Sequence, residues 1–217
     1  FSPAGKLYVS VGSSCNSCVE KERVRASIIE MNPDGSGQRE YARGLRNAVG
    51  LRWIGNFLFA TNQGSDHLGT ARPDETFYAV RQGADYGWPY CHAANGRIFP
   101  DPKIRRKTGC RGVAVPEAAV AARSPELGFD FFDDPETPAV FKDAFIVALH
   151  GSTNKAIGHG YKIVVMRKGE RLQDLVTGFL KAGKVVGRPC DVMKLDARSI
   201  LFSDDHTGVV YIVRQKR

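Results

Sequence analysis

The sequence predicts an all-β protein of the β-propeller class. Short β-rich runs recur along the 217 residues, each ending in small or polar residues and each followed by a partner strand. No long stretch keeps a helical periodicity. A four-stranded propeller blade takes roughly 40–50 residues, so the chain would hold about four blades of a single domain. A β-sandwich is the alternative, although its strands would be spaced more tightly and more evenly.

Eight strands are expected, in four pairs. The first strands of the pairs cover residues 6–11, 56–60, 144–149 and 199–202, and their partners cover residues 26–31, 76–80, 161–166 and 209–213. The sequence NPDG at residues 32–35 supplies a strong turn signal after the first partner strand. The alanine-rich residues 117–122 are compatible with one or two helical turns. Residues 1–5, FSPAG, read as a turn before a strand already inside a fold, so we expect the propeller to be incomplete at its N-terminus.

The basic residues do not form a nucleic-acid surface. The formal net charge is +8, from 31 Lys and Arg against 23 Asp and Glu, and the only dense basic cluster is at residues 103–107. This cluster lacks a helix or interleaved aromatic residues, so we expect a solvated loop. A modest positive field would attract an anionic cofactor or an acidic electron-transfer partner. No apolar run approaches the roughly 20 residues that span a bilayer, so no transmembrane segment is expected.

Five cysteines favour disulfides over a metal site. A zinc site would need a second close pair of cysteines in addition to Cys15 and Cys18. Two local disulfides, Cys15–Cys18 and Cys91–Cys110, would leave Cys190 free, although spacing alone does not fix the connectivity. Such disulfides suit an exported protein, either periplasmic or secreted.

Polar residues gather where expected strands give way to turns. The stretches are RN at residues 46–47, TNQGSD at 61–66 and DYGWPYC at 85–91. Loops that a rigid scaffold holds in place often carry function, so this loop system is the first candidate for a site.

Ten stretches, taken in order, are distributed over nearly the whole chain, from residue 5 to residue 213. They are GKLYVSVGSSCNSC (5–18), NPDGSG (32–37), YARGLRNAVGL (41–51), FATNQGSDHLG (59–69), PDE (73–75), GADYGWPYC (83–91), HGSTNK (150–155), GYK (160–162), GRPCDV (187–192) and SDDHTGVVYIV (203–213). The ordered set resembles the glucose/sorbosone dehydrogenase family of soluble quinoproteins, and the cysteines of SSCNSC and PYC resemble its sorbosone dehydrogenase-like branch. The resemblance implies a six-bladed propeller that binds pyrroloquinoline quinone (PQQ) and calcium at the mouth of its channel.

The resemblance implies the residues that would contact the cofactor. PQQ carries three carboxylates and an electrophilic quinone carbonyl, so it needs Arg and Lys partners and a polarising cation. By similarity, Arg46 and Asn47 would face the quinone, with Arg46 stabilising the negative charge of the reduced cofactor. Gln63 matches a family glutamine that contacts PQQ. Lys155 and Arg188 would pair with the cofactor carboxylates, Lys155 as a point charge rather than a bidentate fork.

The resemblance also implies two calcium sites. The backbone carbonyls of Gly64 and Ser65 would bind the calcium ion next to the quinone, since Ca²⁺ prefers hard oxygen ligands. Ser65 stands where the glucose dehydrogenases have proline, which preserves a carbonyl ligand but lowers the expected stiffness of the loop. Glu75 and the carbonyl of Tyr86 resemble a second, structural calcium site, although their spacing is longer by one residue.

Some positions depart from the family pattern. Thr153 replaces a bulky aromatic residue, and Cys190 stands where the glucose dehydrogenases carry a second arginine. Hydride transfer also needs a general base, usually a histidine, and none of the five histidines matches the family base. In relatives that histidine lies just before the stretch equivalent to residues 1–3, so this chain alone is expected to be inactive. His150, at the end of a strand, is the nearest internal candidate.

The function implied is PQQ- and calcium-dependent oxidation of an aldose or sorbosone-type sugar by hydride transfer to the quinone. The electron acceptor would be a cytochrome or the quinone pool. The alternative is a non-catalytic β-propeller that binds a carbohydrate or a protein, which Thr153 and Cys190 favour. A calcium-dependent lactonase would share the architecture, but it needs a cluster of carboxylate and amide metal ligands that the sequence does not assemble.

Overall fold

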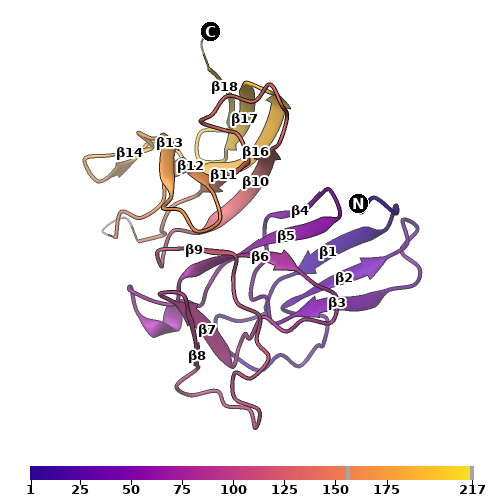
Figure 1. Cartoon of the computed structure of the whole chain (residues 1–217). Coiled ribbons are helices and arrows are strands. Elements are labelled where there is room, and N and C mark those ends of the chain that lie inside the picture. The colour runs from indigo at the N-terminus through magenta and orange to yellow at the C-terminus, as the bar shows by residue number, and fades with distance from the viewer. Residues whose placement is uncertain (155–156, 216–217) are drawn as a thin grey trace. The chain divides into compact units, whose positions relative to one another are not determined.

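The chain folds almost entirely into antiparallel β-sheet. The computed structural model describes residues 1–154 and 157–215. The chain divides into two compact units, Phe1–Ala122 and Arg123–Arg217, which are described separately (Figure 1). In the described residues no helix is long and apolar enough to cross a membrane.

The first unit contains two sheets and a hairpin (Figure 1). The first sheet has the order β1 (Leu7–Val11), β2 (Ser27–Met31) and β3 (Arg39–Arg43). The second sheet has the order β4 (Leu51–Ile54), β5 (Phe57–Asn62), β6 (Glu75–Val80) and β9 (Ala118–Val120). The hairpin pairs β7 (Cys91–Ala94) with β8 (Arg97–Pro100), and a short 3₁₀ helix, η1 (Asp66–Leu68), follows β5.

The second unit also contains two sheets and a hairpin. One sheet has the order β10 (Glu126–Phe132), β11 (Ala144–Leu149), β12 (Lys162–Met166) and β13 (Gln173–Val176). The other has the order β16 (Pro189–Asp196), β17 (Ser199–Asp204) and β18 (Val209–Arg214). The hairpin is formed by β14 (Leu180–Lys181) and β15 (Lys184–Val185).

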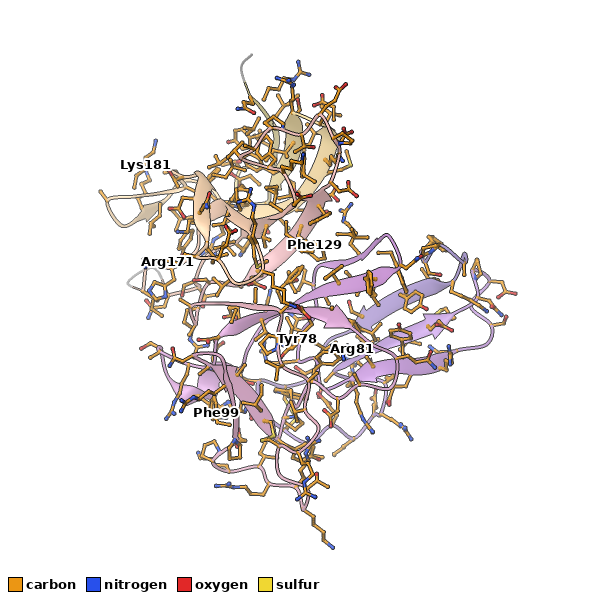
Figure 2. The ribbon with its side chains drawn as sticks, viewed as in Figure 1. Tyr78, Arg81, Phe99, Phe129, Arg171 and Lys181 are labelled. Atoms are coloured by element: carbon orange, nitrogen blue, oxygen red, sulfur yellow. A yellow bond between two sulfur atoms is a disulfide. The ribbon has the colours of Figure 1, made fainter. Side chains whose placement is uncertain are left out.

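Each unit has its own apolar core. The core of the first unit includes Ile28, Leu45, Leu58 and Tyr78, and Figure 2 shows Tyr78 in its interior. The core of the second unit is built from β-branched and aromatic side chains of both of its sheets, among them Phe132, Ile146, Ile163, Val192 and Ile200. Because successive residues of a strand face opposite sides, each sheet offers one apolar face to such a core and leaves its strand ends to carry polar groups.

All eight expected strands are present, and four antiparallel sheets of three or four strands match the expectation of about four blades. One expectation is wrong: residues 117–122 contain the strand β9 instead of helical turns. β9 pairs with the edge of β6, with Thr76 opposite Ala119. The alanines have good helix propensity, but an unpaired sheet edge offers them backbone hydrogen bonds that a single helical turn lacks.

The cysteine pairing is confirmed. Cys15 pairs with Cys18, Cys91 pairs with Cys110, and Cys190 is free. The Cys91–Cys110 bridge closes the basic loop at residues 103–107, which is irregular as expected. Arg106 is nevertheless held in place, because its guanidinium pairs with Asp85 and lies 5.3 Å from the centroid of the Tyr90 ring.

The two disulfides should differ in their contribution to stability. Cross-linking lowers the entropy of the unfolded chain more when the closed loop is longer. Replacing Cys91 and Cys110 together by alanine should lower the free energy of unfolding by about 3 kcal/mol, and replacing Cys15 and Cys18 by about 2 kcal/mol. Denaturant titration followed by tryptophan fluorescence measures both losses of stability, because Trp88 is buried and lies shortly before Cys91 in sequence. A larger loss for the Cys15–Cys18 pair would contradict the loop-length argument.

Candidate functional site

Hydrogen bonds connect two polar strand ends of the first unit. Asn47 precedes β4, and Gln63 directly follows β5. The Gln63 N–H donates to the Asn47 carbonyl at 3.1 Å, and the Asn47 side-chain amide donates to Gln63 Oε1, also at 3.1 Å. The Asn47 N–H donates to Asn62 Oδ1 at 3.2 Å. The sequence-predicted residues Asn47 and Gln63 are therefore neighbours in one network.

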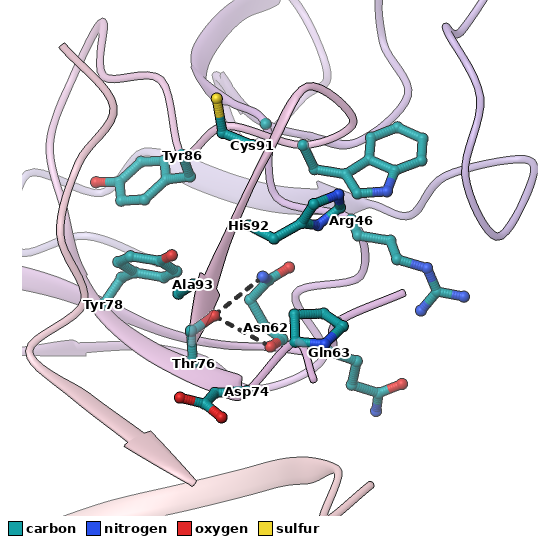
Figure 3. A pocket seen from close by; sticks show the side chains of 14 residues that line it. Arg46, Asn62, Gln63, Asp74, Thr76, Tyr78, Tyr86, Cys91, His92 and Ala93 are labelled. Atoms are coloured by element: carbon teal, nitrogen blue, oxygen red, sulfur yellow. Dashed lines mark hydrogen bonds between the residues drawn. The ribbon is translucent and has the colours of Figure 1, made fainter. Parts of the chain in front are cut away.

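The loop of the Cys15–Cys18 disulfide holds Arg46. Arg46 Nε donates to the carbonyl of Asn16 at 3.2 Å, and the Arg46 carbonyl accepts the Ser13 N–H at 2.8 Å. The side chain of Asn16 accepts the Asp66 N–H at 2.9 Å, so the same loop also contacts η1. Figure 3 shows the side chains of Arg46 and Gln63 extending toward the same side. A guanidinium and an amide presented together suit a ligand with carboxylate or carbonyl oxygens.

The loop of Gly64 and Ser65, which would hold calcium, is fixed by two side chains. The buried carboxylate of Glu75 accepts the Gly64 N–H at 2.7 Å. Ser65 is fully buried, and its hydroxyl accepts the indole N–H of Trp88 at 3.0 Å. A Cβ at Gly64 would lie 2.8 Å from Pro73 Cγ, so the loop has no room for a larger residue there. Trp88 thus stiffens a loop in which Ser65 replaces the proline of the glucose dehydrogenases.

The predicted calcium ligands Glu75 and Tyr86 have different surroundings. Glu75 supports the backbone of Gly64, next to the predicted carbonyl ligands. The phenol of Tyr86 accepts the Arg81 N–H at 2.9 Å and donates to the Ala79 carbonyl at 3.2 Å, and burial raises its pKa. The ring of Tyr86 is therefore a core element, and coordination by its carbonyl stays a prediction.

A small cavity adjoins this network, and Arg46 and Gln63 are among the residues that line it (Figure 3). Its volume is about 20 Å³, and it is lined in part by Asn62, Thr76, Tyr78 and His92. Such a cavity holds one water molecule and no cofactor. Asn62 and Thr76 bond to each other across its wall, with Nδ2 to Oγ1 at 3.2 Å.

The sequence interpretation missed a carboxylate–imidazole cluster in the same unit. His67 of η1 and His92 of β7 both bond to the fully buried Asp101, which follows β8. Burial raises the pKa of Asp101, but hydrogen bonds from the Ile104 N–H and from His92 outweigh this and hold the pKa below its usual range. Burial lowers the pKa of His92. The residues lie too far apart in sequence to form a recognisable spacing, so no pattern pointed to them.

In the second unit, Arg188 is built into a turn. Its guanidinium donates to the carbonyls of Gly151, at 2.9 Å, and Ser152, at 3.2 Å, and lies 5.0 Å from the centroid of the Tyr161 ring. The Nε–H of Arg188 bonds to none of the described residues. This arrangement leaves one edge of the guanidinium for a carboxylate, although part of the fork serves the fold. The predicted contact of Lys155 lies outside the described residues.

The turns around Arg188 explain the neighbouring sequence. Gly151 has a φ of +95°, and a Cβ there would overlap the ring of Tyr161. Asp204 accepts the N–H groups of Arg188 and His206, both at 2.9 Å. Burial raises the pKa of Asp204, but these hydrogen bonds outweigh it and the pKa is lowered. Asp204 therefore stabilises the turn.

His150 contacts a carboxylate, so its role as an internal base stays a prediction, and Cys190 carries a free thiol. His150 Nε2 lies 3.0 Å from both carboxylate oxygens of Asp205. Cys190 is half-buried, and burial raises the pKa of its thiol, which makes it a poor nucleophile.

Comparison with known proteins identifies the fold. No protein-family model matches the chain. An uncharacterized protein of Borreliella burgdorferi is 28% identical over 219 residues, which cover 96% of this chain and 57% of that protein. The chain thus spans little more than half the length of this curated relative.

Solved structures of sugar dehydrogenases are similar. The holo form of the pyranose dehydrogenase PQQ domain from Coprinopsis cinerea matches with a TM-score of 0.79 and 20% identity, over 97% of this chain and 67% of that one. The calcium structure of a Trichoderma reesei enzyme of carbohydrate-active family AA12 matches with a TM-score of 0.77 and 16% identity, over 98% and 65%. The apo aldose sugar dehydrogenase of Escherichia coli matches with 0.69 and 15%, over 97% and 61%. At these identities the likeness establishes the fold, and it confirms the predicted β-propeller class.

The bond between Trp88 and Ser65 should be measurable as a coupling energy. Ser65→Ala leaves a buried indole N–H without its acceptor and should cost about 1–3 kcal/mol of unfolding free energy. Trp88→Phe removes the donor and part of the ring. In Ser65→Ala/Trp88→Phe the unpaired donor is gone, so the double variant should lose less than the sum of the single variants, by about 1 kcal/mol. Additive losses in denaturant titrations would show that the bond contributes nothing.

Variants of Glu75 should separate support of the loop from direct ligation of calcium. In the presence of a chelator, Glu75→Ala should destabilise the protein by about 1–3 kcal/mol, because the Gly64 N–H loses its acceptor. Glu75→Gln keeps an oxygen acceptor and should lose less. The two variants are compared again after calcium is added. A fall in calcium affinity for Glu75→Gln as large as that for Glu75→Ala would mean that the carboxylate itself binds the ion.

Proposed function

We propose that this chain belongs to a PQQ- and calcium-dependent dehydrogenase that oxidises an aldose or a sorbosone-type sugar. The observation that carries the proposal is the network of Arg46, Asn47 and Gln63 at strand ends of a propeller fold, next to the braced loop of Gly64 and Ser65. The similar solved structures, a PQQ domain and an aldose sugar dehydrogenase, support it. Because the chain spans 57% of its curated relative, the activity is proposed for the complete protein.

The residues of this chain would bind and orient the cofactor. Bound PQQ supplies a hydride acceptor for the sugar, and bound calcium supplies a Lewis acid for the quinone carbonyl. The Asn16 carbonyl accepts a hydrogen bond from the guanidinium of Arg46, whose positive charge would stabilise the negative charge of the reduced cofactor. The amides of Asn47 and Gln63 hold each other, so either can donate to a quinone oxygen with little reorganisation.

The remaining roles follow the resemblance. The carbonyls of Gly64 and Ser65 would bind calcium, and Glu75 would keep the loop in shape. Arg188, and Lys155 outside the described residues, would pair with cofactor carboxylates. The two disulfides favour an oxidising compartment, periplasmic or extracellular, where a cytochrome or a quinone pool would take up the electrons.

Two observations favour the alternative, a propeller that binds a ligand without catalysis. The guanidinium of Arg188 donates to three backbone carbonyls, which commits part of its fork to the turn. The half-buried thiol of Cys190 stands where the glucose dehydrogenases have a second arginine. Such a protein would bind PQQ weakly or not at all and would not oxidise sugars.

Reconstitution of the complete protein tests both functions. The chelator-treated protein is titrated with PQQ in the presence of calcium, and the absorbance of the quinone and dye-linked oxidation of a panel of aldoses are followed. Stoichiometric binding and oxidation of at least one aldose are expected. Arg46→Ala should lower kcat by about 10²–10³-fold, as loss of a charge-stabilising donor does. The exposed Arg171, labelled in Figure 2, provides the control variant Arg171→Ala, which should match the wild type.

The outcomes separate the candidates. Absence of PQQ binding in the presence of calcium overturns the proposed function and supports the non-catalytic alternative. Binding without oxidation of any aldose overturns the proposed sugar oxidation. Full activity of Arg46→Ala would leave the enzyme intact but remove Arg46 from the site.

A further inference from the structure

Two histidines and an aspartate of the first unit converge on one point. Nε2 of His67 lies 2.7 Å from Asp101 Oδ2, and Nε2 of His92 lies 2.8 Å from the same oxygen. The two imidazole rings have centroids 5.5 Å apart and are inclined at 61°. The three donor atoms lie within 4.8 Å of one another. Neither histidine has a role in the proposed sugar oxidation.

The three residues come from separate elements that hold them rigidly. His92 lies on β7 next to Cys91, whose disulfide anchors the hairpin. Oδ1 of Asp101 accepts the N–H groups of Lys103 and Ile104, both at 2.8 Å, which leaves Oδ2 directed at the histidines. The side chains of His92 and Asp101 are 3% and 0% exposed. Backbone hydrogen bonds of this kind orient a carboxylate ligand in metal sites.

Two imidazole nitrogens and one carboxylate oxygen are the donor set of a borderline divalent metal. Zn²⁺ binds histidine nitrogen and carboxylate oxygen at about 2.0–2.2 Å, often with three protein ligands and one water. Ca²⁺ prefers sites made of oxygen alone. We propose that His67, His92 and Asp101 form a binding site for a borderline divalent cation such as Zn²⁺, separate from the predicted calcium loop.

The geometry needs only a small adjustment. Tetrahedral bonds of about 2.0–2.1 Å place neighbouring ligand atoms about 3.3 Å apart, so the contacts of 2.7 and 2.8 Å would widen by about half an ångström. His67 can supply this movement, because it lies on the three-residue η1 and its side chain is 21% exposed. The exposed edge of His67 also gives the ion an entry path and gives a water molecule access to the fourth position. Ser17 Oγ, 3.5 Å from His67 Nε2, lies at the same edge.

The competing explanation is a hydrogen-bonded cluster without a metal. Both imidazoles would then donate an Nε2–H to Asp101, and the contacts would be those observed. Metal binding instead requires each neutral imidazole to carry its proton on Nδ1, which leaves both Nε2 atoms free to bind the ion. It would tie η1, which follows the loop of Gly64 and Ser65, to the β7–β8 hairpin.

Titration of the metal alone tests the proposal. Tag-free complete protein, freed of metal by a chelator, is titrated with Zn²⁺ by calorimetry in the presence of millimolar calcium, and with Co²⁺ by visible spectroscopy. One ion per chain and the intense visible bands of four-coordinate Co²⁺ are expected. His67→Gln should weaken binding of Zn²⁺ at least about tenfold. The control His206→Gln, at an exposed histidine outside the cluster, should bind as the wild type does.

Folding is checked so that every outcome is decisive. His92→Gln and Asp101→Asn change buried groups, so their circular dichroism and thermal unfolding are compared with the wild type, and His67→Gln carries the test if they fail to fold. No stoichiometric uptake by the wild type, displacement of Zn²⁺ by calcium, or unchanged affinity in His67→Gln would each overturn the proposal. These results do not depend on PQQ or sugar oxidation, so the proposed function can fail without affecting this site.

Discussion

Asn47 is joined to the end of β5 through its backbone N–H, its carbonyl and its side-chain amide. These bonds fix the segment before β4 against the segment after β5, so two strand ends behave as one rigid rim. Gly12 packs so closely that a Cβ there would lie 2.9 Å from Asn47 Oδ1. Each further part of the candidate site, Arg46 on one side and the loop of Gly64 on the other, continues from this rim and inherits its position.

The loop of Gly64 and Ser65 is stiffened by hydrogen bonds to side chains and not by a proline. A proline would stiffen residue 65 by fixing φ. Ser65 instead receives the indole N–H of Trp88, and Glu75 accepts the N–H of Gly64. A bond between buried partners resists distortion more strongly than its net free energy suggests, because breaking it leaves a polar group without water. The loop can therefore present its backbone in one conformation, as a preorganised binding site requires.

The sequence predicted strands well where a long β-rich run ends at a turn, as in β11 and β17. It failed at residues 117–122, because pairing with the edge of β6 outweighs the helix propensity of alanine. The disulfide pairing was expected from the sequence, although spacing alone did not fix its connectivity, and the structure confirms it. The hydrogen bond from Trp88 to Ser65 and the cluster at Asp101 could not be predicted. Trp88 is 23 residues from Ser65 in sequence, and Asp101 is 34 residues from His67. Long-range side-chain contacts depend on the fold and leave no periodic pattern.

The first unit holds two different sets of potential metal ligands within a few residues of each other. The loop of Gly64 and Ser65 offers backbone carbonyls, which suit a hard cation. His67, on the helix that follows, offers an imidazole to a buried carboxylate, which suits a borderline metal. Because η1 connects both sets, an ion that fixes His67 would reduce the motion of the loop before it, and an ion in the loop would do the same for His67. Thermodynamic linkage makes any such effect equal in both directions, so the coupling of the two affinities measures how rigidly η1 transmits position.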